Sequence, residues 1–169
     1  MSNPGKKIVI VGASASGKST FARKLGKKID QPVTHIDAVM WLPGWEYIGD
    51  EKTVSFIKDL VQKESWILEG YIEKEARVDL FKQADSILYL DYPGWLSAWR
   101  YIKRWFKHRK SPRPELPGSP EKFSFKFLKL VYTKGEVWKL EKLFKEYNWS
   151  EKTRRFKSPK ELQQYLDSL

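Results

Sequence analysis

The sequence contains no cysteine and only two histidines. Disulfides, thiolate metal sites and thiol nucleophiles are therefore excluded, and His35 and His108 have no partner at metal-ligand spacing, so we expect both to be structural. No apolar run approaches the ~20 residues that span a bilayer. The short apolar run after Lys6 and Lys7 is not followed by a cleavage site. We expect a cytoplasmic protein with no membrane partner.

Acidic residues are missing from one long segment. Between Tyr92 and Pro114 there is no Asp or Glu, while the whole chain of 169 residues carries a formal charge of +11. Such a charge indicates polyanionic partners, which include nucleotide phosphates and nucleic acid. The length fits one domain. The positive charge of this segment comes from Arg100, Lys103, Arg104, Lys107, Arg109, Lys110 and Arg113.

A phosphate-binding loop follows the apolar run Ile8 to Val11. Residues 12–19 read GASASGKS, which matches the pattern GxxxxGK[ST]. Phe21, Ala22 and Leu25 continue at helical spacing, so the loop stands between a strand and a helix. Its backbone N–H groups and the helix N-terminus then converge on one point and bind an anion. A chance match to a Gly/Ser-rich turn would lack this context.

The loop predicts a nucleotide site with an accompanying Mg²⁺. Lys18 supplies a charge for the β and γ phosphates, and the Ser19 hydroxyl is the expected metal ligand. Thr20 adds a further donor. The predicted nucleotide-binding residues are Gly12, Ala13, Ser14, Ala15, Ser16, Gly17, Lys18, Ser19 and Thr20.

Strand-like and helix-like segments alternate along the rest of the chain. This alternation predicts a parallel α/β sheet. The prolines 112, 114, 117 and 120 predict a loop or hinge. Further strands are expected at 33–36, 66–68, 86–90 and, more weakly, 152–156, and helices after the phosphate loop and at about 50–63, 78–82, 95–108, 137–147 and 162–166.

Three carboxylates end predicted strands, where α/β folds place their ligands. Asp37 is our candidate for contacting, and deprotonating, an acceptor hydroxyl, with a helix cap or turn as the alternative. Glu69 is placed to order Mg²⁺ or its waters. Asp91 precedes Tyr92 and Pro93 and reads as a turn former.

The basic helix carries two arginines four residues apart. Arg100 and Arg104 leave one face, so both guanidinium groups can bind the same triphosphate and stabilise the charge of its transition state. The lysines of this helix read as a solvated face. Its three tryptophans, Trp95, Trp99 and Trp105, read as packing residues, with base stacking as the alternative.

These motifs resemble the adenylate kinase-like P-loop kinases, and most closely the bacterial topology modulation proteins. The resemblance covers nearly the whole chain and rests on GASASGKST (12–20), HIDAVMWLPGW (35–45), SWILEGY (65–71), ADSILYLDYP (84–93) and RYIKR (100–104). It implies a P-loop NTPase fold with a five-stranded parallel sheet in the order 2-3-1-4-5 and helices on both faces. It also implies ATP with Mg²⁺ on the loop and, in a single domain 1–169, a mobile lid-like insertion at about 95–120.

One departure concerns the acceptor. Adenylate kinases place an arginine for the nucleoside monophosphate where this chain has Glu73, and residues 31–76 contain no arginine. That segment carries several aromatic residues instead, so we expect a small acceptor with a hydroxyl and a flat or apolar body. Arg77, just after this segment, could still supply a single arginine contact to an acceptor phosphate. The predicted activity is a kinase that moves the γ-phosphate of ATP to this acceptor, with Lys18, Asp37, Arg100 and Arg104 as its catalytic residues.

Two other functions compete with the kinase. The basic segment and the family label suggest an ATP-dependent, nucleic-acid-associated regulator, although no helix-turn-helix, zinc finger or RNA-binding motif is present. A GTPase is disfavoured, because the nearest match to its guanine-reading signature, residues 133–136, ends in Glu136 rather than Asp.

Overall fold

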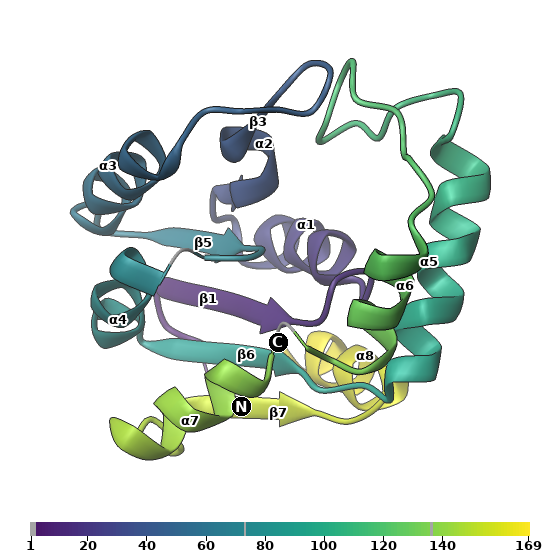
Figure 1. Cartoon of the computed structure of the whole chain (residues 1–169). Helices are drawn as coiled ribbons and strands as arrows, with labels where there is room; N and C mark the ends of the chain where they lie inside the picture. Colours follow the sequence, from purple (N-terminus) through teal and green to yellow (C-terminus); the bar gives the residue numbers. More distant parts are fainter. Residues whose placement is uncertain (1–2, 73, 136) are drawn as a thin grey trace.

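A five-stranded parallel sheet forms the centre of the computed structural model, which describes residues 3–72, 74–135 and 137–169. Counted along the chain, the sheet strands lie in the predicted order 2-3-1-4-5 (Figure 1). Glu73 and Glu136, used in the sequence comparisons, lie outside the described residues. Across the sheet the strands are β2 (Val33–His35), β5 (Trp66–Glu69), β1 (Lys7–Gly12), β6 (Ser86–Leu90) and β7 (Thr153–Phe156).

Both faces of the sheet are buried under helices. In β1, Val9 and Val11 belong to one hydrophobic cluster, and Ile8 and Ile10 belong to the other. This is the expected consequence of side chains that alternate across a strand covered on both sides. The first cluster includes residues of α3 (Asp50–Val61), α4 (Lys74–Gln83) and α7 (Trp138–Glu146); the second includes residues of α1 (Lys18–Ile29) and α8 (Pro159–Ser168).

The segment after β2 differs from the expectation. Ile36, predicted to end a strand, begins the short helix α2 (Ile36–Met40), so Asp37 lies in the first turn of a helix. The aromatic turn that follows is a hairpin of β3 (Trp41–Leu42) and β4 (Glu46–Tyr47). Gly44 and Trp45 both have positive φ at its turn. The pattern of apolar and polar residues is too short here to predict either helix α2 or the β3–β4 hairpin.

Helix α5 (Gly94–His108) occupies the predicted basic segment and is followed by irregular chain through residues 109–124, as the prolines indicated. The next helix, α6 (Phe125–Tyr132), was not predicted. Ser124 caps it by accepting a hydrogen bond from the Phe127 N–H at 3.2 Å. Backbone of α6 approaches α5 so closely that a Cβ on Gly94 would lie 1.8 Å from the Tyr132 carbonyl oxygen.

The prediction that the tryptophans of this helix pack inside is wrong for two of them. Trp95 and Trp99 are exposed, whereas Trp105 contacts the Phe123 ring at 5.1 Å between centroids. The helix turns its arginines inward instead. Within the described ranges, no helix combines the length and apolar character needed to cross a membrane.

Candidate functional site

The loop between β1 and α1 has the backbone that its sequence requires. Gly12 and Gly17 have φ of 150° and 100°, and Ala15 also lies in the left-handed region at 60°. A side chain on Gly12 would bring its Cβ to 2.7 Å from the Leu90 carbonyl oxygen. Strand β6 therefore packs against the loop at a distance that only glycine permits.

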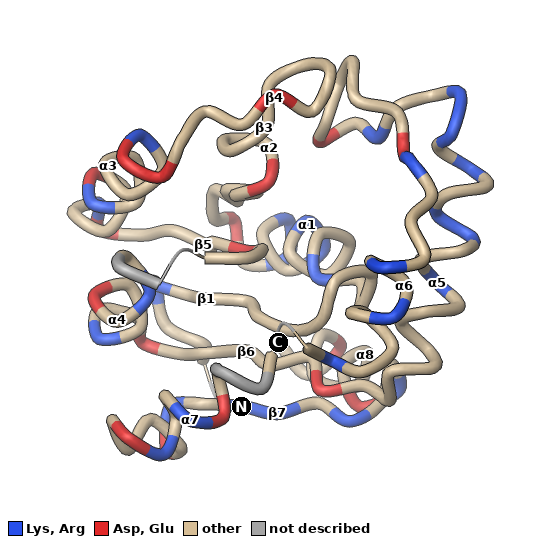
Figure 2. The backbone as a smooth tube through the Cα atoms, viewed as in Figure 1, with Lys and Arg blue, Asp and Glu red and all other residues tan. Residues whose placement is uncertain are grey.

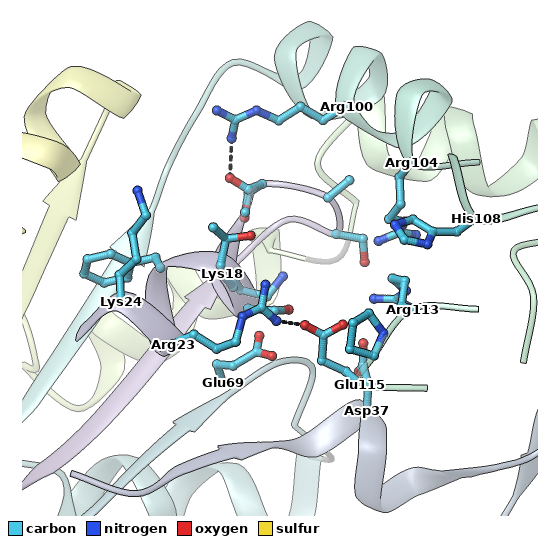
Figure 3. Close-up of a pocket in the computed structure, with 18 of the residues that line it drawn as sticks. Lys18, Arg23, Lys24, Asp37, Glu69, Arg100, Arg104, His108, Arg113 and Glu115 are labelled. Atoms are coloured by element: carbon cyan, nitrogen blue, oxygen red, sulfur yellow. Dashed lines mark hydrogen bonds and ion pairs between the residues drawn. The ribbon is translucent and has the colours of Figure 1, made fainter. Parts of the chain in front are cut away.

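The loop opens onto a cavity of about 780 Å³. Its walls come from the loop, the start of α1, helix α5 and the irregular segment after α5 (Figure 3). Positive charge dominates, because seven lining residues are Lys or Arg and three are Asp or Glu. The basic ones are Lys18, Arg23, Lys24, Arg100, Arg104, Lys107 and Arg113, and the acidic ones are Asp37, Glu69 and Glu115.

The N-terminus of α1 faces this cavity without a side-chain cap. Gly17 is the N-cap residue and makes no side-chain cap hydrogen bond, so the first-turn N–H groups can bind an anion. The Lys18 ammonium donates to the carbonyl oxygens of Gly12 and Ala13 at 3.0 and 2.9 Å. The Ser16 hydroxyl is buried and has no hydrogen-bond partner among the described residues. These donors gather where the sequence predicted phosphate.

Two carboxylates, the buried Glu69 and the half-buried Asp37, line the cavity close enough to Lys18 to feel its charge. Glu69, the last residue of β5, accepts a hydrogen bond from His35 across 2.6 Å between Oε1 and Nδ1. Burial would raise the pKa of Glu69, but its hydrogen bonds with His35 and Ser19 and the charge of Lys18 lower that pKa overall. An ionised carboxylate beside the Ser19 hydroxyl is a donor set that suits Mg²⁺. His35 is thus a partner of Glu69.

Asp37 is shifted in the opposite direction. Burial, and next the negative charge of Glu69, raise the pKa of Asp37 above its ordinary value, against the opposing charges of Lys18, Arg113 and Arg104. Although Asp37 lies in α2 rather than directly at the end of a strand, its side chain reaches the same cavity (Figure 3). A carboxyl with increased proton affinity suits the role of general base.

The two predicted arginines of α5 both line the cavity but have different partners. Arg100 donates to the Ser16 carbonyl oxygen and lies over the Tyr92 ring, 5.3 Å from its centroid. Arg104 pairs with Glu121, at 3.1 Å between Nε and Oε1. Burial lowers the pKa of Arg104. Arg100 therefore contacts the phosphate loop, and Arg104 faces the carboxylate side.

Several charged residues of the cavity were missed as site residues. Arg113, between two prolines, pairs with the same carboxylate oxygen of Glu121 at 2.8 Å, so two guanidinium groups share one buried carboxylate. Arg23 and Glu115 form a further ion pair across the cavity (Figure 3). Arg113 already belonged to the basic segment, but no signal in the sequence pairs it with Glu121, eight residues further on.

Most of the predicted site residues come together. The exceptions are Gly12, which lines a smaller neighbouring cavity of about 50 Å³ together with Arg77, and Ala13, which is buried. Asp91 lies apart in ion pairs with Lys134 and Arg155. The predicted residues that line the larger cavity are Ser14, Ala15, Ser16, Gly17, Lys18, Ser19, Thr20, Asp37, Glu69, Arg100 and Arg104.

Of the aromatic residues expected around the acceptor, Tyr71 lines the smaller cavity together with Asp37, and the residues of the β3–β4 hairpin lie elsewhere. The Trp41 ring packs against Trp45 and Tyr47, with centroids 5.8 and 5.3 Å apart. The Trp45 indole donates to the Pro120 carbonyl oxygen at 2.8 Å. None of these rings lines either cavity described above. They tie the β3–β4 hairpin to the proline-rich segment.

Comparison with known proteins identifies the fold. No family model and no curated protein matches the sequence. A gluconokinase from Sinorhizobium meliloti 1021 is similar in structure over 97% of this chain and 88% of its own, with a TM-score of 0.55 and 17% identity. A protein from Chloroflexus aurantiacus J-10-fl, assigned as a kinase, matches over 78% and 80%, with a TM-score of 0.51 and 20% identity. Neither comparison supports the resemblance to topology modulation proteins. The chain has the α/β fold of P-loop kinases.

Proposed function

We propose that the protein is an ATP-dependent phosphotransferase, which transfers the γ-phosphoryl group of ATP to a hydroxyl of a small acceptor. One observation carries the proposal. The phosphate loop with Lys18 and a half-buried carboxyl of raised pKa, Asp37, line the same positively charged cavity. Phosphoryl transfer needs a phosphate cradle, compensation of developing charge and a group that receives the acceptor proton. This cavity supplies all three.

The roles follow from the contacts. The loop amides and Lys18 hold the β and γ phosphates, and Arg100, held beside the loop, adds charge there. Ser19 and Glu69 would hold Mg²⁺, which supplies charge neutralisation on the phosphates when bound. Asp37 accepts the proton of the acceptor hydroxyl. Segment 95–120, which includes all but the first residue of α5, acts as a lid-like insertion in a single domain. ATP use suits a cytoplasmic protein.

The acceptor that fits this cavity is small and polar. The larger cavity that Asp37 lines also includes Arg104, His108 and Arg113, whereas Tyr71 lines only the smaller cavity of about 50 Å³. Arg77 is not free to clamp a phosphate, because its Nε and Nη2 donate to the Ile72 carbonyl oxygen at 3.1 and 2.6 Å. We therefore replace the flat, apolar acceptor of the sequence prediction by a hydrophilic hydroxyl compound, and nucleoside monophosphates remain disfavoured.

Substitution of Lys18 tests the assignment. We expect Lys18→Ala to lower acceptor-dependent ADP release from ATP by about 100-fold or more, as removal of a donor to developing charge does. Polyhydroxylated acids and sugars form the acceptor panel. Lys27→Ala, an exposed lysine of the same helix, is the matched control and should keep full activity. Equal turnover in both variants would refute the kinase assignment.

The competing function, an ATP-dependent regulator on DNA, makes a different prediction. Contacts between lysines and backbone phosphates give binding without sequence preference that falls steeply with salt. Titration of duplex DNA across a salt series separates the two functions. DNA binding near physiological salt, without acceptor-dependent turnover, would favour the regulator over the kinase. It would also argue against placing the protein in the adenylate kinase-like group.

A further inference from the structure

Helix α5 turns its arginines to the cavity and an apolar stripe to solvent. Trp95, Trp99 and Phe106 are 61%, 51% and 57% exposed. With half-buried Ile102 they are spaced three or four residues apart, so they lie along one side of the helix. We call these four residues the α5 ridge. A row of large exposed apolar side chains marks an interaction surface.

The apolar surface continues toward α6 through a chain of ring contacts. Phe106 contacts Trp105 at 4.6 Å between centroids, Trp105 contacts Phe123 at 5.1 Å, and Phe123 contacts Phe125 at 4.9 Å. Phe125 is 79% exposed, and Tyr132 at the other end of α6 is 60% exposed. Both helices therefore present exposed aromatic rings to solvent.

The charges around these rings have one sign. Residues 93–114 and 122–135 contain no Asp or Glu, and Figure 2 shows Lys and Arg along both helices. Lys103 places its ammonium 4.9 Å from the Trp99 ring centroid, and the Arg109 guanidinium lies 5.4 Å from that of Phe106. Exposed rings flanked by cations on the same helix are the pattern of segments that lie in a membrane interface.

We propose that the α5 ridge and the exposed rings of α6 dock on an anionic lipid surface. The rings enter the boundary between headgroups and acyl chains, and the flanking lysines and arginines extend to the lipid phosphates. Docking of this kind needs neither a membrane-spanning helix nor a cleaved leader, and the expectation of no membrane partner rested on the lack of these two features. The chemistry recognised is an apolar layer under a negatively charged surface.

Two other occupants fit less well. A second copy of the chain would bring two basic helices together, and their like charges would oppose pairing. Single-stranded nucleic acid is bound in grooves where bases stack on free ring faces. The ridge residues line neither cavity described above, and cations already cover one face of Trp99 and of Phe106.

Docking leaves the nucleotide cavity free. Arg100 and Arg104 leave α5 on the cavity side, whereas the ridge lies on the solvent side of the same helix. Ridge substitutions should therefore change membrane binding without changing turnover of soluble substrates. Membrane docking is therefore independent of the proposed kinase activity.

Cosedimentation with vesicles tests the proposal. The full chain should sediment with mixed phosphatidylcholine and phosphatidylglycerol vesicles, less so at high salt, and not with phosphatidylcholine alone. Trp95→Asn with Trp99→Asn should weaken binding about tenfold or more, because two large rings leave the apolar layer. Lys103→Gln should weaken it severalfold. Leu42→Asn, at an exposed apolar residue of β3, should bind like the unchanged chain.

Melting curves establish that each variant folds. If the double Trp variant does not fold, Lys103→Gln alone still tests the proposal. Absence of cosedimentation with the mixed vesicles, or equal binding by the ridge variants, overturns the proposal. Light scattering that shows a dimer converted to monomer by the Trp substitutions would assign the ridge to a second copy instead. Loss of oligonucleotide binding in the same variants, without vesicle binding, would assign it to nucleic acid.

Discussion

At the scale of single residues, two neighbouring carboxyls of the cavity are shifted in opposite directions. Glu69 has a lowered pKa because His35, Ser19 and Lys18 stabilise its charge against the cost of burial. Asp37 has a raised pKa because burial and the charge of Glu69 disfavour ionisation. Pairs of titratable groups with opposite shifts separate a group that stays charged from one that exchanges a proton. The opposite pKa shifts thus support the proposal that Glu69 holds the cation and that Asp37 acts as the base.

Replacement of Asp37 should separate activity from stability. A carboxyl whose pKa is raised by folding stabilises the native state only while it is protonated, so this contribution is lost as pH rises from the ordinary value of 3.8 through the folded-state pKa. Asp37→Asn should therefore melt at a higher temperature than the unchanged chain at neutral pH, and lose that advantage at low pH. Its turnover should fall about 100-fold or more.

The measurement is a melting temperature for both proteins across a pH series, together with acceptor-dependent ADP release. Asp59→Asn, at an exposed aspartate of α3, is the control and should change neither property. A lower melting temperature of Asp37→Asn at neutral pH would contradict the raised pKa of Asp37.

Glu121 should matter more for stability than an exposed glutamate with a similar partner. Its carboxylate is almost fully buried between Arg104 and Arg113, so Glu121→Gln leaves two guanidinium groups without a counter-charge and should cost about 3 kcal/mol of unfolding free energy. Glu141→Gln removes an exposed ion pair with Arg155 and should cost less than about 1 kcal/mol. Urea unfolding measures both, and equal effects would contradict this difference.

At the scale of elements, close backbone approaches decide how the helices sit on the sheet. A Cβ on Gly26 of α1 would lie 2.4 Å from Val33 Cγ2 and 2.8 Å from the Gln31 carbonyl oxygen. Helix α1 can therefore pack this closely on the start of β2 only because residue 26 has no side chain. Since α1 carries Lys18 and Ser19 at its N-terminus, the same contact positions the phosphate site.

Gly26→Ala should destabilise the protein although alanine is the better helix former. Alanine gains about 1 kcal/mol in helix propensity, but forcing a methyl group into this contact costs about 1–3 kcal/mol. The net result should be a loss of up to about 2 kcal/mol. Gly26→Ala should lower the free energy of unfolding less when Val33→Ala is also present, because one of the two clashes then disappears. The double variant is compared with Val33→Ala alone. Chemical unfolding measures all three variants. A stabilised Gly26→Ala would refute the close packing.

At the scale of the whole molecule, positive charge predominates among the charged residues of the cavity. Seven of its ten Lys, Arg, Asp and Glu residues are basic, and they come from α1, α5 and the segment after α5. Only the folded chain brings these groups together, so a polyanion that binds the cavity stabilises the native state selectively.

A thermal shift should show this coupling. At one hundred times its dissociation constant, a nonhydrolysable ATP analogue should add about 2.7 kcal/mol to the free energy of unfolding, which raises the melting temperature by several degrees for a chain of this size. Adenosine, which lacks phosphates, is the control and should give little shift. Equal shifts by both ligands would mean that the phosphate loop does not carry the binding.

The sequence by itself determined the strands of the sheet, the phosphate loop and the positive segment, because each depends on local pattern: buried strands are apolar, a loop that cradles phosphate needs glycines, and prolines exclude a helix. The strand order came from the resemblance to the P-loop kinases and not from local pattern. It also named eleven of the residues that line the cavity. It missed α2 and α6, because short helices lack a readable period. Asp37 was therefore expected at the end of the second strand, whereas it lies in α2.

Only the tertiary structure decided the contacts between distant segments. The pairing of Arg104 and Arg113 on Glu121, the tie between Trp45 and Pro120, and the outward turn of Trp95 and Trp99 depend on which helix side meets the core. An amphipathic helix has two faces, and the sequence does not say which of them the fold buries when arginines line a cavity. In α5 the arginines point toward the cavity, and the α5 ridge faces solvent.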